Sequence, residues 1–179
     1  MTEQKIFCDL DGVLADFDSG MSKICKKSVS WVKSMDQELV WKMLNKHPGV
    51  FEELPVMPEC NYLWSSLLPY KPVILSGCPR SKVSKNAKVS WCKKYLGENF
   101  LQVNSVEEID KNPDYDYYII LTSTRKKPQF ASYGSILIDD RKIIDKEWEE
   151  SGGIFFHYDG SNAAKIITTI KMDNIIYKK

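Results

Sequence analysis

The sequence predicts an α/β fold, a doubly wound parallel sheet with a group of helices inserted after its first strand. Three observations support this prediction. Short apolar runs alternate with segments of helical periodicity throughout the second half of the chain. The first apolar run, Ile6-Phe7-Cys8, leads directly into two carboxylates and a glycine turn. The stretch 16–70, which separates this run from the next one, has helical periodicity and no convincing strand.

The first half of the chain is predicted to provide one strand and three helices. Residues 4–9 form the strand, because a short apolar run that ends at a turn is typical of a buried strand. Asp36 suits the N-cap position of the second helix, and Pro48-Gly49 provides a stop signal. The three helices are expected over residues 16–28, 36–46 and about 58–68.

The second half is predicted to alternate strand and helix, which favours a parallel sheet. Strands are expected over 72–76, 117–121, 135–138 and 154–158, and helices over 81–96 and 162–171. The helix over 81–96 is expected to bury the face formed by Val83, Ala87, Trp91 and Tyr95. Residues 98–116 are polar and fit a strand, a loop or a short helix; they look like an insertion beside the core.

The composition limits the class of partner. The chain has 179 residues, enough for one domain, and 25 basic against 24 acidic residues give a net charge of +1. This balance provides no electrostatic footprint for long nucleic acid or for an anionic membrane. No apolar stretch approaches the roughly 20 residues of a membrane span, and the N-terminus lacks the order of a signal peptide. Five scattered cysteines without a C-x-x-C pair favour reduced thiols in a cytoplasmic protein.

Two pairs of carboxylates follow predicted strands, at the edge of a parallel sheet where ligands usually bind. Asp9 and Asp11 follow the first strand, and Asp139 and Asp140 end the apolar run 136–138. Carboxylates this close repel each other unless a proton or a cation lies between them. A hard divalent cation with oxygen ligands, Mg²⁺ above all, meets that requirement.

Four segments, in order along the chain, resemble the four motifs of the haloacid dehalogenase (HAD) superfamily of aspartate-nucleophile phosphotransferases. The first motif resembles Asp9-Leu10-Asp11-Gly12-Val13-Leu14, and the second resembles Val73-Ile74-Leu75-Ser76-Gly77. Arg125-Lys126-Lys127 offers the lysine of the third motif, with the choice between Lys126 and Lys127 open. The fourth motif resembles Ile136-Leu137-Ile138-Asp139-Asp140-Arg141. The resemblance implies a core of residues 1–15 and 71–179 and a small helical cap of residues 16–70, which would close over the site.

The resemblance also implies the chemistry of the carboxylates. Asp9 would attack phosphorus and form an aspartyl-phosphate, which divides one difficult displacement into two easier steps. Asp11 would protonate the leaving oxygen and later activate the hydrolytic water. Mg²⁺ would be held by Asp9, the main-chain carbonyl of Asp11, and Asp139, with Asp140 beside them.

Three further residues are expected to bind the phosphoryl group. Ser76 and the backbone amide of Gly77 would donate hydrogen bonds to its oxygens, and Lys127 would supply a positive charge. The segment Ser76-Gly77-Cys78-Pro79 differs by one residue from the small hydroxyl pair that is usual in the family described next. A phosphate donor is therefore either lost or replaced by a backbone amide.

Within the superfamily, the chain is most similar to the 5'(3')-deoxyribonucleotidases. The likeness is carried by residues 9–17, 48–58, 120–127 and 137–141. In that family, aromatic side chains of the cap sandwich the base of a nucleoside monophosphate, and stacking on an aromatic face stabilises a base by about 1–3 kcal/mol. The resemblance implies a substrate pocket formed by Phe17, Trp31, Val32 and Trp41, with Arg125 reaching the phosphate.

The predicted function is therefore Mg²⁺-dependent hydrolysis of nucleoside monophosphates, with deoxyribonucleoside 5'-monophosphates as the expected class. One alternative is a phosphatase for another small phosphate ester, or for a 3'-phosphate end of a nucleic acid held along Lys82, Lys85 and Lys88. Another is a non-catalytic module that binds a nucleotide. The expected partner is a small nucleotide substrate and not long nucleic acid or a membrane. The sequence does not decide between a monomer and a homodimer. Both histidines, His47 and His157, are interpreted as structural or surface residues.

Overall fold

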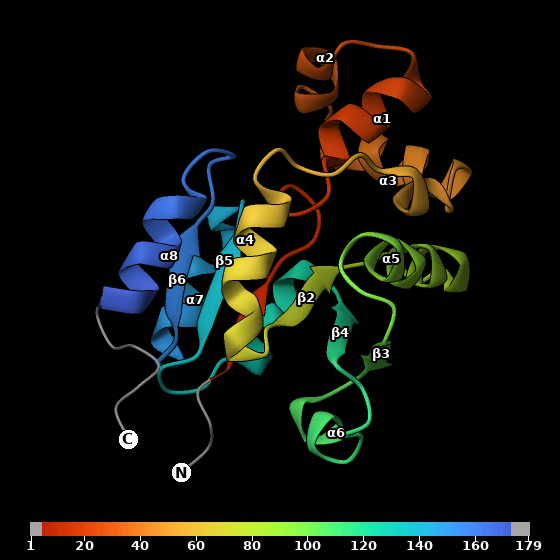
Figure 1. The fold of residues 1–179 in the computed structure, drawn as a ribbon. Helices are drawn as coiled ribbons and strands as arrows, with labels where there is room; N and C mark the ends of the chain where they lie inside the picture. The colour runs from red at the N-terminus through yellow and green to blue at the C-terminus, as the bar shows by residue number, and fades with distance from the viewer. Residues whose placement is uncertain (1–4, 173–179) are drawn as a thin grey trace.

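A six-stranded parallel sheet forms the centre of the protein, and the computed structural model describes residues 5–172 of the chain. The strand order is β3-β4-β2-β1-β5-β6, and every neighbouring pair is parallel (Figure 1). The strands are β1 (Ile6–Cys8), β2 (Val73–Gly77), β3 (Phe100–Val103), β4 (Tyr117–Thr122), β5 (Ile136–Asp139) and β6 (Ile154–His157). The predicted α/β class is confirmed.

Helices cover both faces of the sheet, as the predicted doubly wound topology requires. Side chains alternate across β1, so that Ile6 and Cys8 belong to one core cluster and Phe7 to the other. The first cluster contains α4 (Cys60–Leu67), α5 (Lys82–Tyr95) and α8 (Ala163–Met172). The second contains α6 (Val106–Asp110) and α7 (Asp145–Glu150). The first strand is therefore buried on both sides, which explains its continuous apolar run.

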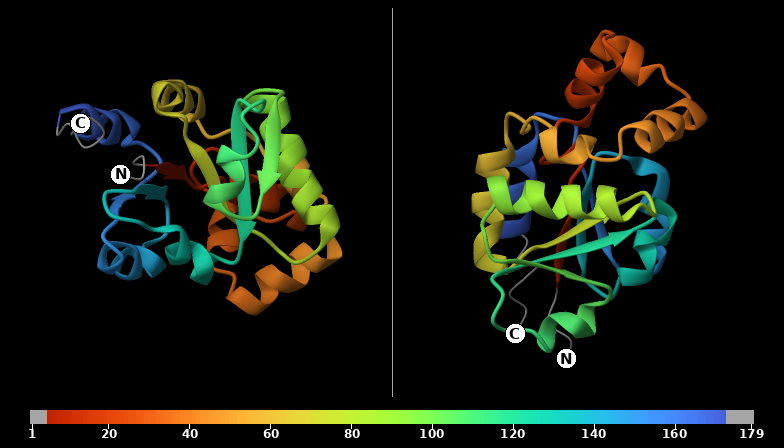
Figure 2. Two further views of the ribbon diagram at one scale, coloured as in Figure 1. Left: turned by 90° about the horizontal axis from the view of Figure 1, so that it is seen from below. Right: turned by 90° about the vertical axis from the view of Figure 1, so that its right-hand side faces the viewer.

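Three helices stand together beyond the carboxyl end of the sheet (Figures 1 and 2). They are α1 (Phe17–Cys25), α2 (Val29–Lys33) and α3 (Gln37–Lys46). Each begins at a side-chain cap: Asp16, Ser28 and Asp36 accept hydrogen bonds from backbone N–H groups three residues later. The predicted helix over 36–46 is confirmed together with its cap, and α2 is an additional short helix.

Two adjacent chain segments connect this helical group to the sheet. Ala15 and Val56 form an antiparallel bridge, the amide of Asp16 donates to the Pro55 carbonyl at 2.7 Å, and that of Met57 donates to the Leu14 carbonyl at 2.8 Å. The next helix, α4, packs against α8, and η1 (Val50–Glu53) packs against α5. Of the stretch 16–70, α1–α3 stand off the sheet, and the division into core and cap subdomains stays a prediction.

The remaining connections are short 3₁₀ turns, η1 (Val50–Glu53), η2 (Leu68–Tyr70), η3 (Thr124–Phe130) and η4 (Lys142–Ile144). Residues 98–116, which the sequence left open, provide the edge strand β3 and helix α6. Residues 98–116 thus extend the edge of the sheet, where β3 pairs with β4, and their interpretation as an insertion stays a prediction. Among residues 5–172, no helix is both long enough and apolar enough to cross a membrane.

Candidate active site

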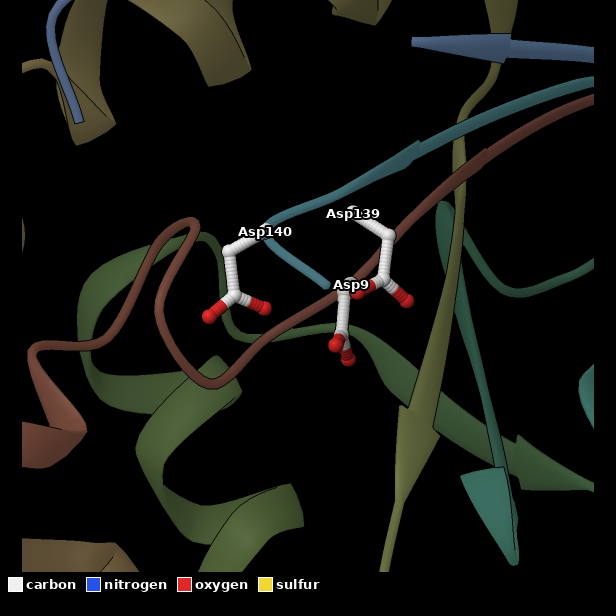
Figure 3. A group of neighbouring side chains, drawn as sticks. All are labelled: Asp9, Asp139 and Asp140. Atoms are coloured by element: carbon white, nitrogen blue, oxygen red, sulfur yellow. The ribbon is translucent and has the colours of Figure 1, made fainter. Parts of the chain in front are cut away.

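Three carboxylates meet at the carboxyl ends of β1 and β5. The two strands are neighbours, and the amide of Asp9 donates to the Ile138 carbonyl at 2.9 Å, which places Asp9 beside Asp139. Asp140 follows in the chain, and one oxygen from each of the three side chains lies within 4.8 Å of the others (Figure 3). Asp9 and Asp139 are fully buried. The sheet topology therefore assembles the acidic group that the sequence predicts.

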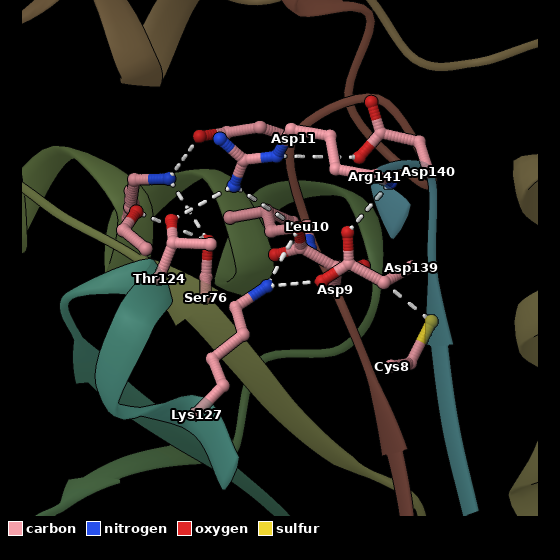
Figure 4. A network of polar contacts seen from close by, with 12 residues as sticks. Cys8, Asp9, Leu10, Asp11, Ser76, Thr124, Lys127, Asp139, Asp140 and Arg141 are labelled. Carbon is pink, nitrogen blue, oxygen red and sulfur yellow. Dashed lines mark hydrogen bonds and ion pairs between the residues drawn. The ribbon is translucent and has the colours of Figure 1, made fainter. Parts of the chain in front are cut away.

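A buried lysine balances part of this negative charge. Nζ of Lys127 lies 2.7 Å from Oδ2 of Asp9 and 2.6 Å from Oδ2 of Asp139 (Figure 4). Lys127 is fully buried, whereas its neighbour Lys126 is exposed. Of the two candidate lysines, the structure brings Lys127 to the carboxylates.

Arg141 approaches the same group from the exposed side. Its Nη2 atom lies 3.9 Å from Oδ2 of Asp9 and donates a 3.0 Å hydrogen bond to Thr124 Oγ1, and its Nε atom lies 3.9 Å from Oδ1 of Asp140. The side chain is 47% exposed. The guanidinium can therefore meet both the carboxylates and a ligand in the space above them.

The carboxylates differ in their tendency to hold a proton. Burial alone would raise the pKa of Asp9, but the charges of Lys127 and Arg141 outweigh it and hold the pKa below its ordinary value. Burial, assisted by the charge of Asp9, raises the pKa of Asp139. Burial and the charges of Asp9 and Asp139 raise the pKa of Asp140 to about 8. Of these three carboxyl groups, Asp9 is the one whose pKa is lowered, which favours the ionised form that a nucleophile requires.

Asp11 faces a second buried lysine. Nζ of Lys88, a residue of α5, lies 2.5 Å from Oδ2 of Asp11 and donates to Ser76 Oγ at 3.0 Å. Burial raises the pKa of Asp11 despite this lysine. Asp9 and Asp11 therefore differ in the direction that separates a nucleophile from a proton donor.

Two glycines let the backbone pass close to the site. Gly12 has a φ of +80°, and a Cβ atom there would clash with the Asp140 carboxylate. A Cβ atom on Gly77 would lie 2.7 Å from Thr124 Oγ1 and 3.7 Å from Arg141 Nη2. Gly77 ends β2, and its lack of a side chain leaves room for these two side chains, which are hydrogen-bonded to each other.

A cavity of about 990 Å³ opens above the carboxylates and extends to α1–α3. Asp11, Asp140 and Arg141 line its polar end. Its other end, next to α1–α3, has many apolar side chains and also Asp18, Lys33 and Gln37. Of the predicted substrate-pocket residues, Phe17, Val32 and Trp41 line it. The apolar end is completed by Val29, Met35, Val40, Leu44, Phe51 and Met57.

Two predicted site residues lie elsewhere. Trp31 is 36% exposed, with Lys27 Nζ 5.8 Å from its ring centroid, and it does not line the cavity. The reason is helical spacing, because Val29 and Val32 occupy the cavity side of α2 and Trp31 falls on another side. Arg125 is exposed and lines a different cavity, with Ile143, Ile144 and Glu147. Arg141 occupies the place beside Asp9 that was predicted to hold Arg125 near the phosphate.

The residues fit a divalent metal ion. Oδ1 of Asp140 is buried and has no hydrogen-bond partner among residues 5–172, and Gly12 leaves space beside this carboxylate. Three carboxylates provide the hard oxygen ligands that Mg²⁺ prefers. The side chain of Asp11 does not join this group because Lys88 holds it.

Comparison with known proteins supports the fold. A hydrolase from Streptococcus pneumoniae TIGR4 has a TM-score of 0.51 at 11% identity over 95% of this chain and 100% of that one. This likeness supports the parallel α/β fold with helices on both faces of the sheet.

Two further solved structures are similar to the chain at lower TM-scores. A haloacid dehalogenase-like hydrolase from S. pneumoniae has a TM-score of 0.46 at 15% identity, over 87% of this chain and 84% of that one. A predicted phosphatase from Clostridium acetobutylicum has a TM-score of 0.48 at 15% identity, over 93% and 99%. No family model and no curated protein sequence matches the chain. At these identities the likeness concerns the fold alone.

Sequence reasoning missed three residues of the site. Lys88 was assigned to a surface groove with Lys82 and Lys85, but it is fully buried, so this assignment is wrong. Arg141 and Thr124 lie within segments that carry the resemblance to the family, but no role in the site was predicted for either residue. For Lys88 a signal existed, because helical spacing from Ala87 and Trp91 also covers positions 84 and 88.

Proposed function

We propose that the protein is a Mg²⁺-dependent phosphomonoester hydrolase that acts through an aspartyl-phosphate on Asp9. One observation carries the proposal: Asp9 is buried 2.7 Å from Lys127, whose charge lowers the pKa of Asp9, and it lies two residues from Asp11, whose pKa is raised by burial. This combination supplies a nucleophile and a proton donor at one edge of the sheet. A module that only binds a nucleotide has no use for such a pair.

Different residues would carry out nucleophilic attack, proton transfer and stabilisation of the phosphoryl charge. Asp9 attacks phosphorus, while Asp11 gives a proton to the leaving oxygen and then takes one from the water that hydrolyses the phosphoenzyme. The backbone at Gly77, with Arg141 and Lys127, stabilises the charge of the transferred group. Mg²⁺ bound by Asp9, Asp139 and Asp140 would shield the attacking carboxylate from the phosphate.

Nucleoside monophosphates, and deoxyribonucleoside 5'-monophosphates in particular, are the proposed substrates. The cavity supports this choice, since its volume of about 990 Å³ suits a molecule of that size. Its apolar end offers the rings of Phe17 and Trp41 to a base, and its polar end offers Arg141 to one phosphate. Within the described lining, Lys33 is the other cation, and it pairs with Asp18. This favours a monophosphate over a polyphosphate.

The test is phosphate release from ribo- and deoxyribonucleoside 5'- and 3'-monophosphates and an aryl phosphate, with Mg²⁺ or with EDTA. Wild-type protein is expected to turn over a few deoxyribonucleotides, and Asp9→Asn to lose turnover while it stays folded. Asp114→Asn is the matched control, because Asp114 is exposed and lies outside the site. Equal activity of Asp9→Asn and wild type would refute the mechanism. Turnover of the aryl phosphate without any nucleotide would keep the mechanism and move the substrate to another small ester.

A further inference from the structure

Lys88 is a charged side chain in a place where charge is costly. Residues 5–172 contain two fully buried lysines, Lys88 and Lys127, and both contact aspartates of the site. Lys127 has a role in the proposed function, whereas Lys88 is fully buried and is not among the residues that line the cavity. A buried cation is tolerated only where its partners compensate for lost hydration. The nature of those partners therefore indicates what Lys88 does.

Three partners from three separate segments fix the Lys88 ammonium group. It lies 2.5 Å from Asp11 Oδ2, 3.0 Å from Ser76 Oγ and 4.3 Å from the ring centroid of Phe51. Phe51 belongs to η1, the segment that returns from the helical group, and its ring stacks on Phe17 with centroids 6.4 Å apart. Lys88 thus joins the carboxylate after β1 to the end of β2 and to the cavity wall.

The ion pair leaves one oxygen of Asp11 available. Oδ2 is held by Lys88, while Oδ1 is buried and has no hydrogen-bond partner among the described residues. Asp11 itself lines the cavity, beside Gly12 and Asp140. With one oxygen fixed by Lys88, the carboxyl plane cannot rotate freely, and Oδ1 is the oxygen that has no partner among the described residues.

We propose that Lys88 is a positioning residue that holds Asp11 in the orientation needed to protonate the leaving oxygen of a phosphomonoester. The proposal rests on the proposed function. It also gives Ser76 the role of anchoring Lys88 through a hydrogen bond, in place of its predicted role as a direct phosphate donor. Lys88 acts through Asp11, so its removal harms the step that needs a proton donor. Esters with a poor leaving group depend on that proton far more than aryl phosphates do.

The experiment compares kcat/KM for an alkyl phosphate and for p-nitrophenyl phosphate in wild type, Lys88→Met, Lys88→Arg and Lys93→Met. This ratio covers the steps up to phosphoenzyme formation, when the leaving group departs. Lys88→Met is expected to lose about 100-fold on the alkyl ester and less than about 10-fold on the aryl ester. Lys93, exposed on the same helix, is the matched control and should change neither.

A double-mutant cycle with Asp11→Asn isolates the positioning role. Because Lys88 acts through Asp11, Lys88→Met should produce no further selective loss in the Asp11→Asn protein. Equal losses on both esters, or a full additional loss in the double variant, would overturn the proposal. If Lys88→Met does not fold, Lys88→Arg decides, since it keeps the charge but moves the donor and should show the same selective loss.

Different results would refute the proposed function and the role of Lys88. Absence of Asp9-dependent turnover of both esters in the wild type would reject the proposed function itself. Wild-type turnover that depends on Asp9, together with unchanged ester selectivity in both Lys88 variants, would reject only the role of Lys88.

Discussion

Nζ of Lys127 lies 2.7 Å from Oδ2 of Asp9, and neither side chain is more than 1% exposed. Replacing Lys127 by Met removes a buried positive charge beside the proposed nucleophile and the transferred phosphoryl group. We expect kcat to fall about 100- to 1,000-fold, the usual effect of losing one such group. Lys126→Met should change kcat less than about 2-fold, because Lys126 is exposed. The measurement is steady-state phosphate release by both variants; similar losses in the two would contradict the assignment.

The raised pKa of Asp140 predicts an unusual dependence of stability on pH. An acid whose pKa is higher in the folded than in the unfolded protein takes up a proton on folding, so stability falls as pH rises between the two values. For Asp140 this window extends from about 4 to about 8, and Asp139 shifts in the same direction. Asp9, with a lowered pKa, contributes only below that window.

Mg²⁺ should remove this loss of stability, since the metal replaces the proton among the carboxylates. We therefore expect the difference in Tm between samples with Mg²⁺ and samples with EDTA to increase from about pH 5.5 to about pH 8. Thermal unfolding at several pH values measures it, with Asp140→Asn as the variant in which the increase becomes smaller, since the raised pKa of Asp139 remains. A difference in Tm that does not change with pH would contradict the prediction.

Gly12 should tolerate no side chain. At a φ of +80°, alanine is strained by about 1–3 kcal/mol, and its Cβ would meet the Asp140 carboxylate. We expect Gly12→Ala to lower the free energy of unfolding by that amount and to weaken Mg²⁺ binding at least 10-fold. Gly49→Ala is the control, because nothing lies within 4 Å of a Cβ there. Urea unfolding and calorimetric Mg²⁺ titration test both variants, and an unchanged Mg²⁺ affinity in Gly12→Ala would count against the metal site.

Trp41 and Trp31 offer a matched test of the substrate cavity. Trp41 lines the cavity and is 42% exposed, so one ring face is available for stacking, whereas Trp31 lies outside the cavity. If a base stacks on Trp41, Trp41→Ala should raise KM for a nucleotide roughly 5- to 150-fold. Its KM for a small aryl phosphate, and both KM values of Trp31→Ala, should stay near wild type. A reversed pattern would place the base on α2.

The sheet could be predicted from the sequence because its central strands are buried on both faces. Their apolar runs are continuous, and the carboxylates of Asp9 and Asp139 mark where two of them end. Helix α7 was not predicted, because its six residues show no apolar periodicity and bury only Trp148; their sequence is Asp-Lys-Glu-Trp-Glu-Glu. The site was thus predictable where it depends on strand ends.

The direction in which side chains point from helices and turns was harder to predict from the sequence than the strands were. On α5, Val83 is 53% and Tyr95 38% exposed, whereas Ser84 and Lys88 are buried, so the buried face is rotated by one position from the predicted one. A lysine on a helix is most often at the surface, and its partner Asp11 lies 77 residues away in the chain. The position of Arg141 beside Asp9 was not predicted either, because Arg141 lies in a turn after a strand, where no periodicity indicates side-chain direction.

The pairing of β1 with β5 also sets when the site can exist during synthesis. Asp9 is synthesised well before Asp139 and Asp140, which join it only after β5 has left the ribosome and paired with β1. A nascent or truncated chain that ends before β5 therefore contains Asp9 and Lys127 but lacks the carboxylates of Asp139 and Asp140. Affinity for Mg²⁺ would consequently require β5, and Mg²⁺ binding would report the pairing of β1 with β5.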